Sequence, residues 1–295
     1  MNNPLFSMII CLSKNSPSFE YYEKIILEFA DNFGYHIQID GKPFEYTELE
    51  KILDLLKRIG IKEVGIRTNE KIDLNILNLI KKYDIRSLMF RDKNEFLDEN
   101  IKLANNTIPI EVSVILQKDN IEELDNIITN YNEKNISLLV LERSIIAKYR
   151  NENFNPLEPK DYKKVMEKII DYNCSNNRMG IALSHCPNKI LLHKDEKYVN
   201  NLGGCSAGIV SCAINDNGDV IPCLPLFSVF VGNIKENSLI DIWNNSNVFI
   251  NLRDRTKLRG KCRKCEYIYS CGGCRAESFY NNNSLFCEDN TCWKE

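Results

Sequence analysis

The chain has 295 residues, of which 43% are hydrophobic and 27% are charged, values that are ordinary for a globular protein. Its formal net charge of -3 gives no reason to expect nucleic acid or an anionic membrane as a partner. No apolar run approaches the ~18–20 residues that cross a bilayer, and residues 1–15 lack the basic start and cleavage site of a signal peptide. We therefore expect a cytoplasmic protein.

The first part of the chain alternates short apolar runs with amphipathic segments. Runs typical of strands occupy residues 5–13, 35–40, 62–68, 86–91, 108–116, 137–143 and 179–185. Between them, apolar residues recur three and four positions apart, as in the helix predicted for 46–59, which Gly60 ends. Ser16-Pro17 predicts the start of the first helix, and Asp73 and Asn120 predict the caps of two later helices.

This alternation predicts parallel strands joined by crossover helices. Six or seven strand–helix units are too few for a closed eight-stranded barrel. The predicted fold class is therefore α/β, with a partial (β/α)6-type barrel over residues 1–190 and a doubly wound open sheet as the alternative. Neither GxGxxG nor GxxxxGK[ST] occurs, so no motif supports a nucleotide-phosphate site.

The composition changes near residue 190, beyond which glycine and cysteine become more frequent. Residues 191–295 are therefore predicted to form a small cysteine-rich domain. Within it, CAINDNGDVIPC (212–223) predicts a β-hairpin in which Asn217 and Gly218 both take positive φ. The Asp-Asn-Gly-Asp stretch lacks the later glutamate of a calcium loop, so a simple turn is favoured.

Twelve cysteines are unusual for such a composition, and only Cys11 precedes residue 174. Stable disulfides are rare in the cytoplasm, and a chain of this length can bury a core without them. Cys262-x2-Cys265 and Cys271-Gly-Gly-Cys274 can each supply two thiolates to a metal site. Spacing alone leaves both zinc and iron–sulfur clusters open. The basic run 253–264 would stabilise a negatively charged cluster, although a solvated basic surface explains it equally well.

A wider pattern surrounds these cysteines. It comprises Cys205, Cys212, Gly218-x4-Cys223, Gly232-Asn233-Ile234, Ser238-Leu239-x2-Ile242-Trp243, Cys262-x2-Cys265-x5-Cys271-Gly-Gly-Cys274-Arg-Ala and Asp289-x2-Cys292. Over about residues 203–294 this pattern closely resembles the SPASM domain, the C-terminal auxiliary-cluster domain of radical S-adenosylmethionine (SAM) enzymes. The Cys-Gly-Gly-Cys-Arg-Ala form is most similar to the branch with haem-synthesis and peptide-maturing members, although other members have one more residue between those two cysteines.

The resemblance implies two [4Fe–4S] clusters of the auxiliary type. It assigns the first cluster to Cys205, Cys212, Cys223 and Cys274, and the second to Cys262, Cys265, Cys271 and Cys292. Cys287 competes with Cys292 for the last position, but Cys292 follows Asp289 at the family spacing. Cys174 and Cys186 match no position and are expected to be buried free thiols.

The same resemblance implies a catalytic cluster on a Cys-x3-Cys-x2-Cys loop after the first strand, and here Cys11 stands alone in CLSKNSPSFEYYEK. The family's Gly-Gly-Glu-Pro turn, which receives the SAM ammonium, corresponds to Asp40-Gly41-Lys42-Pro43. Gly41 and Pro43 survive as a remnant of this cofactor-binding turn, but Lys42 places a cation where an ammonium would bind, which argues against SAM. An ordinary turn explains these residues equally well. The three histidines, His36, His185 and His193, lack metal-ligand spacing.

We therefore expect an iron–sulfur protein of the radical SAM/SPASM family with a degenerate catalytic core. It would act as a non-catalytic or altered partner in peptide, protein or cofactor modification, by presenting substrate or relaying electrons. Its expected partners are a peptide substrate or a complete radical SAM enzyme. Two alternatives stay open: an active radical SAM maturase of a peptide or cofactor, and a zinc-stabilised interaction module.

Overall fold

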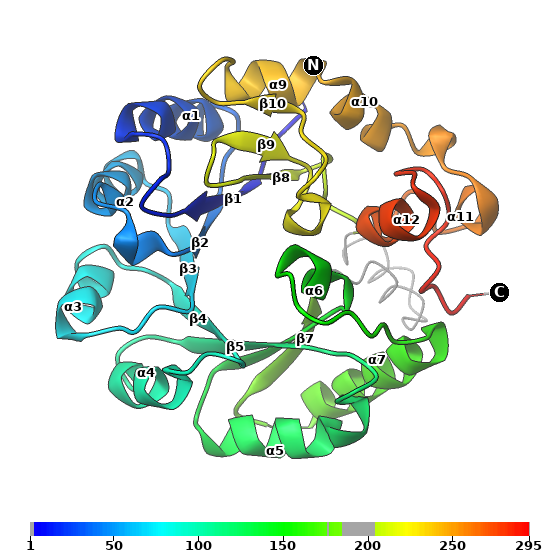
Figure 1. Ribbon diagram of the computed structural model, residues 1–295, viewed down its shortest axis with the longest axis horizontal. Helices are drawn as coiled ribbons and strands as arrows, with labels where there is room; N and C mark the ends of the chain where they lie inside the picture. Colours follow the sequence, from blue (N-terminus) through cyan, green and yellow to red (C-terminus); the bar gives the residue numbers. More distant parts are fainter. Residues whose placement is uncertain (1–2, 176, 185–203, 295) are drawn as a thin grey trace.

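Seven parallel strands form a curved wall in this computed structural model, which describes residues 3–175, 177–184 and 204–294 (Figure 1). In chain order they are β1 (Ser7–Leu12), β2 (His36–Gly41), β3 (Glu63–Thr68), β4 (Ser87–Arg91), β5 (Ile110–Ile115), β6 (Leu138–Glu142) and β7 (Gly180–Ser184). Each strand pairs in parallel with the next, and β7 forms one edge of the sheet. The sheet therefore stays open among the described residues, and the predicted partial barrel is confirmed.

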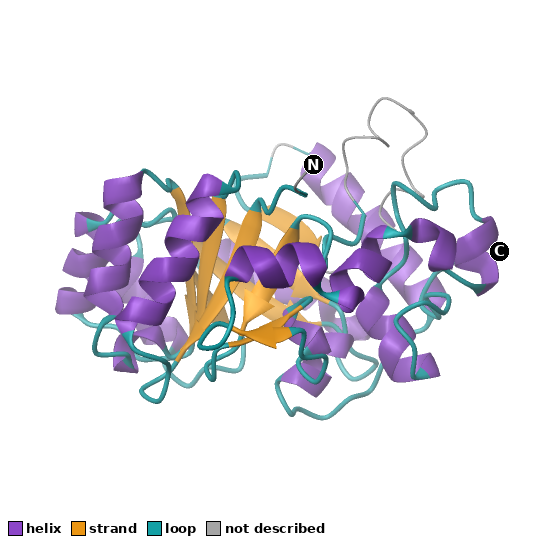
Figure 2. Ribbon diagram, turned by 90° about the horizontal axis from the view of Figure 1, so that it is seen from above, coloured by secondary structure: helices purple, strands orange, loops and turns teal. Residues whose placement is uncertain are grey.

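Helices cover the outer side of this wall (Figures 1 and 2). They are α1 (Phe19–Asp31), α2 (Leu49–Ile59), α3 (Leu74–Lys82), α4 (Leu97–Ala104), α5 (Leu124–Glu133) and α7 (Pro159–Cys174). Their apolar stripes pack on the outward side chains of the strands, as the periodicity predicted. The short helix α6 (Ile145–Tyr149) differs, because Figure 1 shows it inside the ring of helices.

The predicted helix ends hold in part. α2 ends at Gly60, whose φ of 83° is left-handed, and the Asp73 carboxylate accepts the N–H of Ile76 at 2.8 Å as an N-cap. The first helix begins at Phe19, with Ser18 as its N-cap residue, instead of at Ser16-Pro17. The Ser16 hydroxyl oxygen accepts the N–H of Ser13 at 2.9 Å and so closes the preceding turn.

The side chain of Asn120 does not cap a helix, contrary to the prediction. Its side chain accepts the N–H of Gln117 at 2.9 Å and donates to the carbonyl of Ile115 at 2.8 Å. It therefore closes the loop that follows β5, and the helix predicted there begins as a 3₁₀ turn, η2 (Ile121–Glu123), before α5. An asparagine so placed can serve a turn as readily as a cap.

The cysteine-rich part continues the same sheet. Strand β8 (Ser211–Ile214) pairs in parallel with β1, and β9 (Asp219–Ile221) and β10 (Gly232–Asn233) follow as antiparallel neighbours. The remaining elements are η4 (Leu224–Leu226), α9 (Leu239–Asn245), α10 (Asn247–Arg253), η5 (Arg255–Lys257), α11 (Gly260–Lys264) and α12 (Arg275–Asn282). The proposed boundary at residue 190 lies outside the described residues.

The hairpin between β8 and β9 is confirmed, but its turn differs from the prediction. Gly218 has a φ of 87°, whereas Asn217 is not among the described residues with positive φ. The side-chain oxygen of Asn215 accepts the N–H groups of Asn217 and Asp219 at 3.0 and 2.9 Å, so a longer loop replaces the expected two-residue turn. Within the described part of the chain, no helix combines the length and apolarity that a membrane crossing requires.

Candidate metal centre

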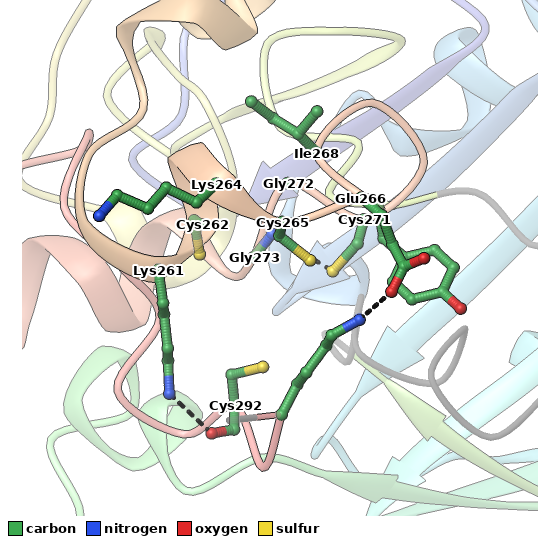
Figure 3. Close-up of a pocket in the computed structure, with 12 residues that line it drawn as sticks. Lys261, Cys262, Lys264, Cys265, Glu266, Ile268, Cys271, Gly272, Gly273 and Cys292 are labelled. Carbon is green, nitrogen blue, oxygen red and sulfur yellow. Dashed lines mark hydrogen bonds and ion pairs between the residues drawn. The ribbon is translucent and has the colours of Figure 1, made fainter.

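Four cysteines line one cavity of about 420 Å³ beside the C-terminus. Cys262 lies on α11, Cys265 directly follows this helix, Cys271 lies in the next loop and Cys292 lies near the chain end. Figure 3 shows their sulfur atoms pointing toward a common space. Cys287 does not line this cavity. These four cysteines are called the second group below.

A pair of glycines separates Cys271 from Cys274. Gly272 and Gly273 have φ values of 69° and 63°, in the left-handed region that favours glycine. A Cβ on Gly272 would lie 2.3 Å from a guanidinium nitrogen of Arg255. The two glycines therefore let the chain reverse in a crowded place, so that Cys271 faces the cavity and Cys274 does not.

Cys274 instead packs with Cys223 in a small core between the barrel and α12, together with Ile145 of α6. Cys205 belongs to the same neighbourhood, because its charge contributes to the raised pKa of Cys223 after the larger effect of burial. The N–H of Cys205 also donates to the carbonyl of Cys271 at 3.0 Å. Cys205, Cys223 and Cys274 are called the first group below.

Cys212 lies apart from the first group. On β8 it is in register with Met8, and both side chains belong to the main core between the sheet and its outer helices. The next residue, Ala213, packs instead with Cys11 on the inner side of the wall. Because successive strand residues face opposite sides, Cys212 points outward, whereas Cys223 and Cys274 lie in the inner cluster.

Buried arginines surround the two groups. Arg275 is 1% exposed, and it donates to the carbonyls of Gly273, Leu285 and Cys287 at 3.2, 3.0 and 2.9 Å. One of its nitrogens lies 4.0 Å from the Cys262 sulfur. A fixed cation at this position stabilises negative charge on sulfur or on a cluster held by it.

Arg143 connects the end of β6 to the cysteine-rich part. Its guanidinium lies 3.7 Å from carboxylate oxygens of both Glu277 and Asp289, and all three side chains are buried. Burial raises the pKa of Glu277. Burial acts in the same direction on Asp289, but Arg143 and the N–H of Cys274 outweigh it and lower the pKa of that carboxylate. The Asp289 charge is therefore stable at neutral pH.

Burial favours the protonated form of several of these cysteines in the metal-free protein. Burial raises the pKa of Cys271 to about 12, and it also raises the pKa values of Cys274 and Cys292. Thiols bind metals as thiolates, so loading either group must release protons.

The donor set fits a cluster better than a single ion. Among the described residues, no three His, Cys, Asp or Glu side chains lie close enough together to hold one metal ion. The second group instead surrounds a space of about 420 Å³ with four soft sulfur donors, the ligand type of iron–sulfur clusters.

The barrel holds a second notable arrangement, at the carboxyl ends of its strands. Asp40 is the next-to-last residue of β2 and is fully buried. Its carboxylate accepts from Nε of Arg67 at 2.9 Å and from Arg91 at 3.2 Å. Arg67 also lies 3.4 Å from Glu142 at the end of β6, and Glu142 pairs with Arg150 beyond α6. These five residues are called the ion-pair network.

Cys11 faces the same interior. Its sulfur lies 3.6 Å from the hydroxyl of Tyr149 on α6, and burial raises its pKa to about 12. No second described cysteine accompanies it there. The remnant turn lies nearby: Gly41 has a φ of 89°, and Lys42 points to solvent, where it pairs with Glu45 at 2.9 Å. Pro43 begins the short helix η1 (Pro43–Glu45).

Two further candidates among the described residues, His36 and Cys174, take no part in these arrangements. His36 bonds the Ser7 hydroxyl at 2.9 Å. Cys174 is a free thiol, but the expectation that it is buried is wrong: it is the last residue of α7 and is exposed. Cys186, His185 and His193 lie outside the described residues. Sequence reasoning missed the ion-pair network, although lone charges inside apolar runs, such as Asp40 and Glu142, were a usable signal.

Comparison with known families identifies the cysteine-rich part. The model of the SPASM family, an iron–sulfur cluster-binding domain, matches residues 205–266. An AdoMet-dependent heme synthase of Methanosarcina barkeri is 26% identical over 200 residues, which are 62% of this chain and 56% of that protein. The mycofactocin maturase MftC of Mycobacterium tuberculosis is 35% identical over 95 residues, 31% of this chain and 24% of that protein. The chain thus spans about half of the first relative and a quarter of the second.

Solved structures share the whole fold. SuiB of Streptococcus suis bound to the precursor peptide SuiA gives a TM-score of 0.78 at 19% identity, covering 99% of this chain and 76% of that one. SuiB bound to S-adenosylmethionine gives 0.75 at 18% identity, covering 99% and 78%. At this identity the likeness establishes the fold.

Proposed function

We propose that this chain is an iron–sulfur partner protein of the radical SAM/SPASM family and that it does not itself cleave SAM. It would serve a peptide, protein or cofactor modification system by presenting substrate or relaying electrons. The ion-pair network is the observation that carries this proposal.

The network occupies the strand ends where the resemblance implies a cluster loop and a SAM turn. Arg67 and Arg150 hold Asp40 and Glu142 in a charge-paired arrangement, and all four side chains are nearly completely buried. Displacing any of them for a ligand would strand a partner charge, which typically costs about 3–5 kcal/mol. Together with the lone Cys11, this supports a barrel in which buried ion pairs stabilise the strand ends and no catalytic cluster or SAM is bound there.

The cysteine-rich part, in contrast to the barrel, supports the binding of auxiliary clusters. The second group, with Cys292 instead of Cys287, would hold one cluster, and the first group would contribute to another. Such clusters accept and release single electrons. The chain's own residues supply the surrounding cations and exclude water from Cys262, Cys271 and Cys274.

The partner is proposed from the relatives' names. SuiB is seen with its precursor peptide, and MftC is a maturase. A peptide substrate, or a complete radical SAM enzyme that acts on one, is therefore the proposed partner of this chain.

Anaerobic purification with iron and sulfide analysis, followed by incubation of the reduced protein with SAM, tests the proposal. We expect a brown protein with iron and sulfide in equal amounts, and no 5′-deoxyadenosine above a protein-free control. Deoxyadenosine formation would establish the active maturase instead. A colourless protein with stoichiometric zinc would establish the zinc-stabilised module.

A further inference from the structure

A buried arginine with a free hydrogen-bond donor lies between the two groups of cysteines. Arg255 begins η5, and its side chain is 6% exposed. Its Nη2 donates to the carbonyl of Cys205 at 3.3 Å, whereas Nη1 is buried and has no hydrogen-bond partner among the described residues. Folded proteins rarely leave a buried donor without an acceptor, because its desolvation is then uncompensated. The free Nη1 therefore indicates a ligand atom that accepts from it.

Arg255 faces both groups but interacts more strongly with the first. Its guanidinium lies against the turn after Cys271, where a Cβ on Gly272 would lie 2.3 Å from Nη1 and 2.4 Å from Cζ. Glycine at this position therefore leaves the room that the guanidinium occupies. Burial lowers the pKa of Arg255, and the charge of Cys205 opposes this effect more than the charges of the second-group cysteines do. The first group is thus the stronger electrostatic partner of Arg255.

Arg275 is equally buried but has no free donor of this kind. Its Nε and Nη1 donate to three backbone carbonyls, and none of its nitrogen atoms is a buried donor without a partner in the described part of the chain. These bonds hold the C-terminal loops together and account for the burial of Arg275. The bond from Arg255 to Cys205 leaves Nη1 unused, so the fold alone does not account for a guanidinium at this place.

Resting on the auxiliary clusters of the proposed function, we propose that Arg255 is a positioning residue whose Nη1 donates a charge-assisted hydrogen bond to a sulfur atom of the cluster held by the first group. Hydrogen bonds to the sulfur atoms are among the factors that set the reduction potential of a cluster. Reduction adds one negative charge, which the guanidinium stabilises, so Arg255 raises the potential of this cluster. No covalent or coordination bond forms or breaks, and the cluster of the second group is affected less.

Redox titration of the anaerobically purified full chain, followed by electron paramagnetic resonance, tests the proposal. The signal of the first group is the one that Cys223→Ala loses. At the potential that half-reduces this cluster in the unaltered protein, Arg255→Met should lower the ratio of reduced to oxidised cluster about tenfold, a shift of about 59 mV for one electron. Arg259→Met is the matched control, because it removes the same charge from an exposed position, and its ratio should change less than about twofold.

A measurement on the unaltered protein decides the matter if Arg255→Met binds no iron. With the arginine side chains labelled by the heavy nitrogen isotope, we expect hyperfine coupling of a guanidinium nitrogen to the reduced cluster of the first group. Arg255→Lys keeps the positive charge but removes the guanidinium, so it should abolish this coupling. Absence of the coupling, its persistence in Arg255→Lys, or an unchanged ratio in iron-loaded Arg255→Met would overturn the proposal.

Iron and sulfide analysis of the same samples separates this proposal from the proposed function. An unaltered protein that binds no iron contradicts the proposed function, and with it the role of Arg255. An iron-loaded protein that forms no 5′-deoxyadenosine, and that shows neither the shift in ratio nor the nitrogen coupling, contradicts only the role of Arg255.

Discussion

The backbone N–H of Cys274 donates a 2.8 Å hydrogen bond to the buried carboxylate of Asp289. The N–H of Asp289 in turn donates to the Cys262 sulfur at 3.5 Å, and its carbonyl accepts the N–H of Cys292 at 3.1 Å. One residue therefore contacts a cysteine of the first group and two of the second. The carboxylate also meets Arg143, so the barrel and both groups share one anchoring point.

Asp289→Ala should lower iron binding at both groups at once. The substitution removes the acceptor of the Cys274 N–H and leaves Arg143 with less negative charge nearby. Loss of such a supporting residue typically lowers metal affinity about 10–100-fold. Iron content and the electron paramagnetic resonance of the reduced protein measure the effect, with Asp241→Asn, an exposed acid in the first turn of α9, as the control. Loss confined to one cluster signal would contradict the shared role.

Cys212→Ala should retain its iron, whereas Cys223→Ala should lose that of the first group. The reason is the strand phase that directs Cys212 to the outer core beside Met8 and Cys223 to the inner cluster with Cys274. Iron and sulfide per chain, compared among these two variants and the unaltered protein, provide the measurement. Equal iron loss in both variants would restore Cys212 to the ligand set that the family resemblance assigned.

The strands of the barrel could be predicted because each is a local apolar run whose period is independent of distant residues. The attachment of β8 to β1 could not, since Cys212 and Met8 are about two hundred positions apart and nothing in either segment specifies the pairing. The hairpin turn could be predicted in part. Gly218 was correctly predicted as a turn residue, but the length of the loop depends on hydrogen bonds of the Asn215 side chain that the sequence did not reveal.

The candidate site, like the fold, could be predicted only in part. Spacing identified the cysteines, because ligands on tight turns are close in sequence. It could not reveal which side of a strand Cys212 faces. The ion-pair network escaped notice because Asp40, Arg67 and Glu142 each look like isolated charges until the parallel register brings their strand ends together.

Arg67→Met should destabilise the fold by about 3–5 kcal/mol, because Asp40 and Glu142 would each lose a buried partner. The free energy of unfolding in urea, followed by circular dichroism, measures this change. Arg58→Met is the matched control: its side chain is 66% exposed and lies 3.8 Å from Glu23, so its loss should cost less than about 0.5 kcal/mol. Similar values for the two variants would show that the network contributes no more than a surface pair.

Stability should decrease in acid because of Asp40. Burial alone would raise the pKa of this carboxyl, but Arg67 and Arg91 outweigh it and hold the pKa below its usual range. In the unfolded chain an aspartate titrates near about 3.9. The unfolded state therefore takes up a proton first as the pH falls, and the stabilisation present at neutral pH is lost from about pH 5 downward.

Asp40→Asn removes this titration. The free energy of unfolding of this variant should therefore fall less steeply between about pH 5 and pH 3 than that of the unaltered protein. Asp289, whose pKa is also lowered, should preserve part of the slope. Parallel pH profiles for the two proteins would mean that Asp40 titrates alike in the folded and unfolded states, contrary to its placement between two guanidinium groups.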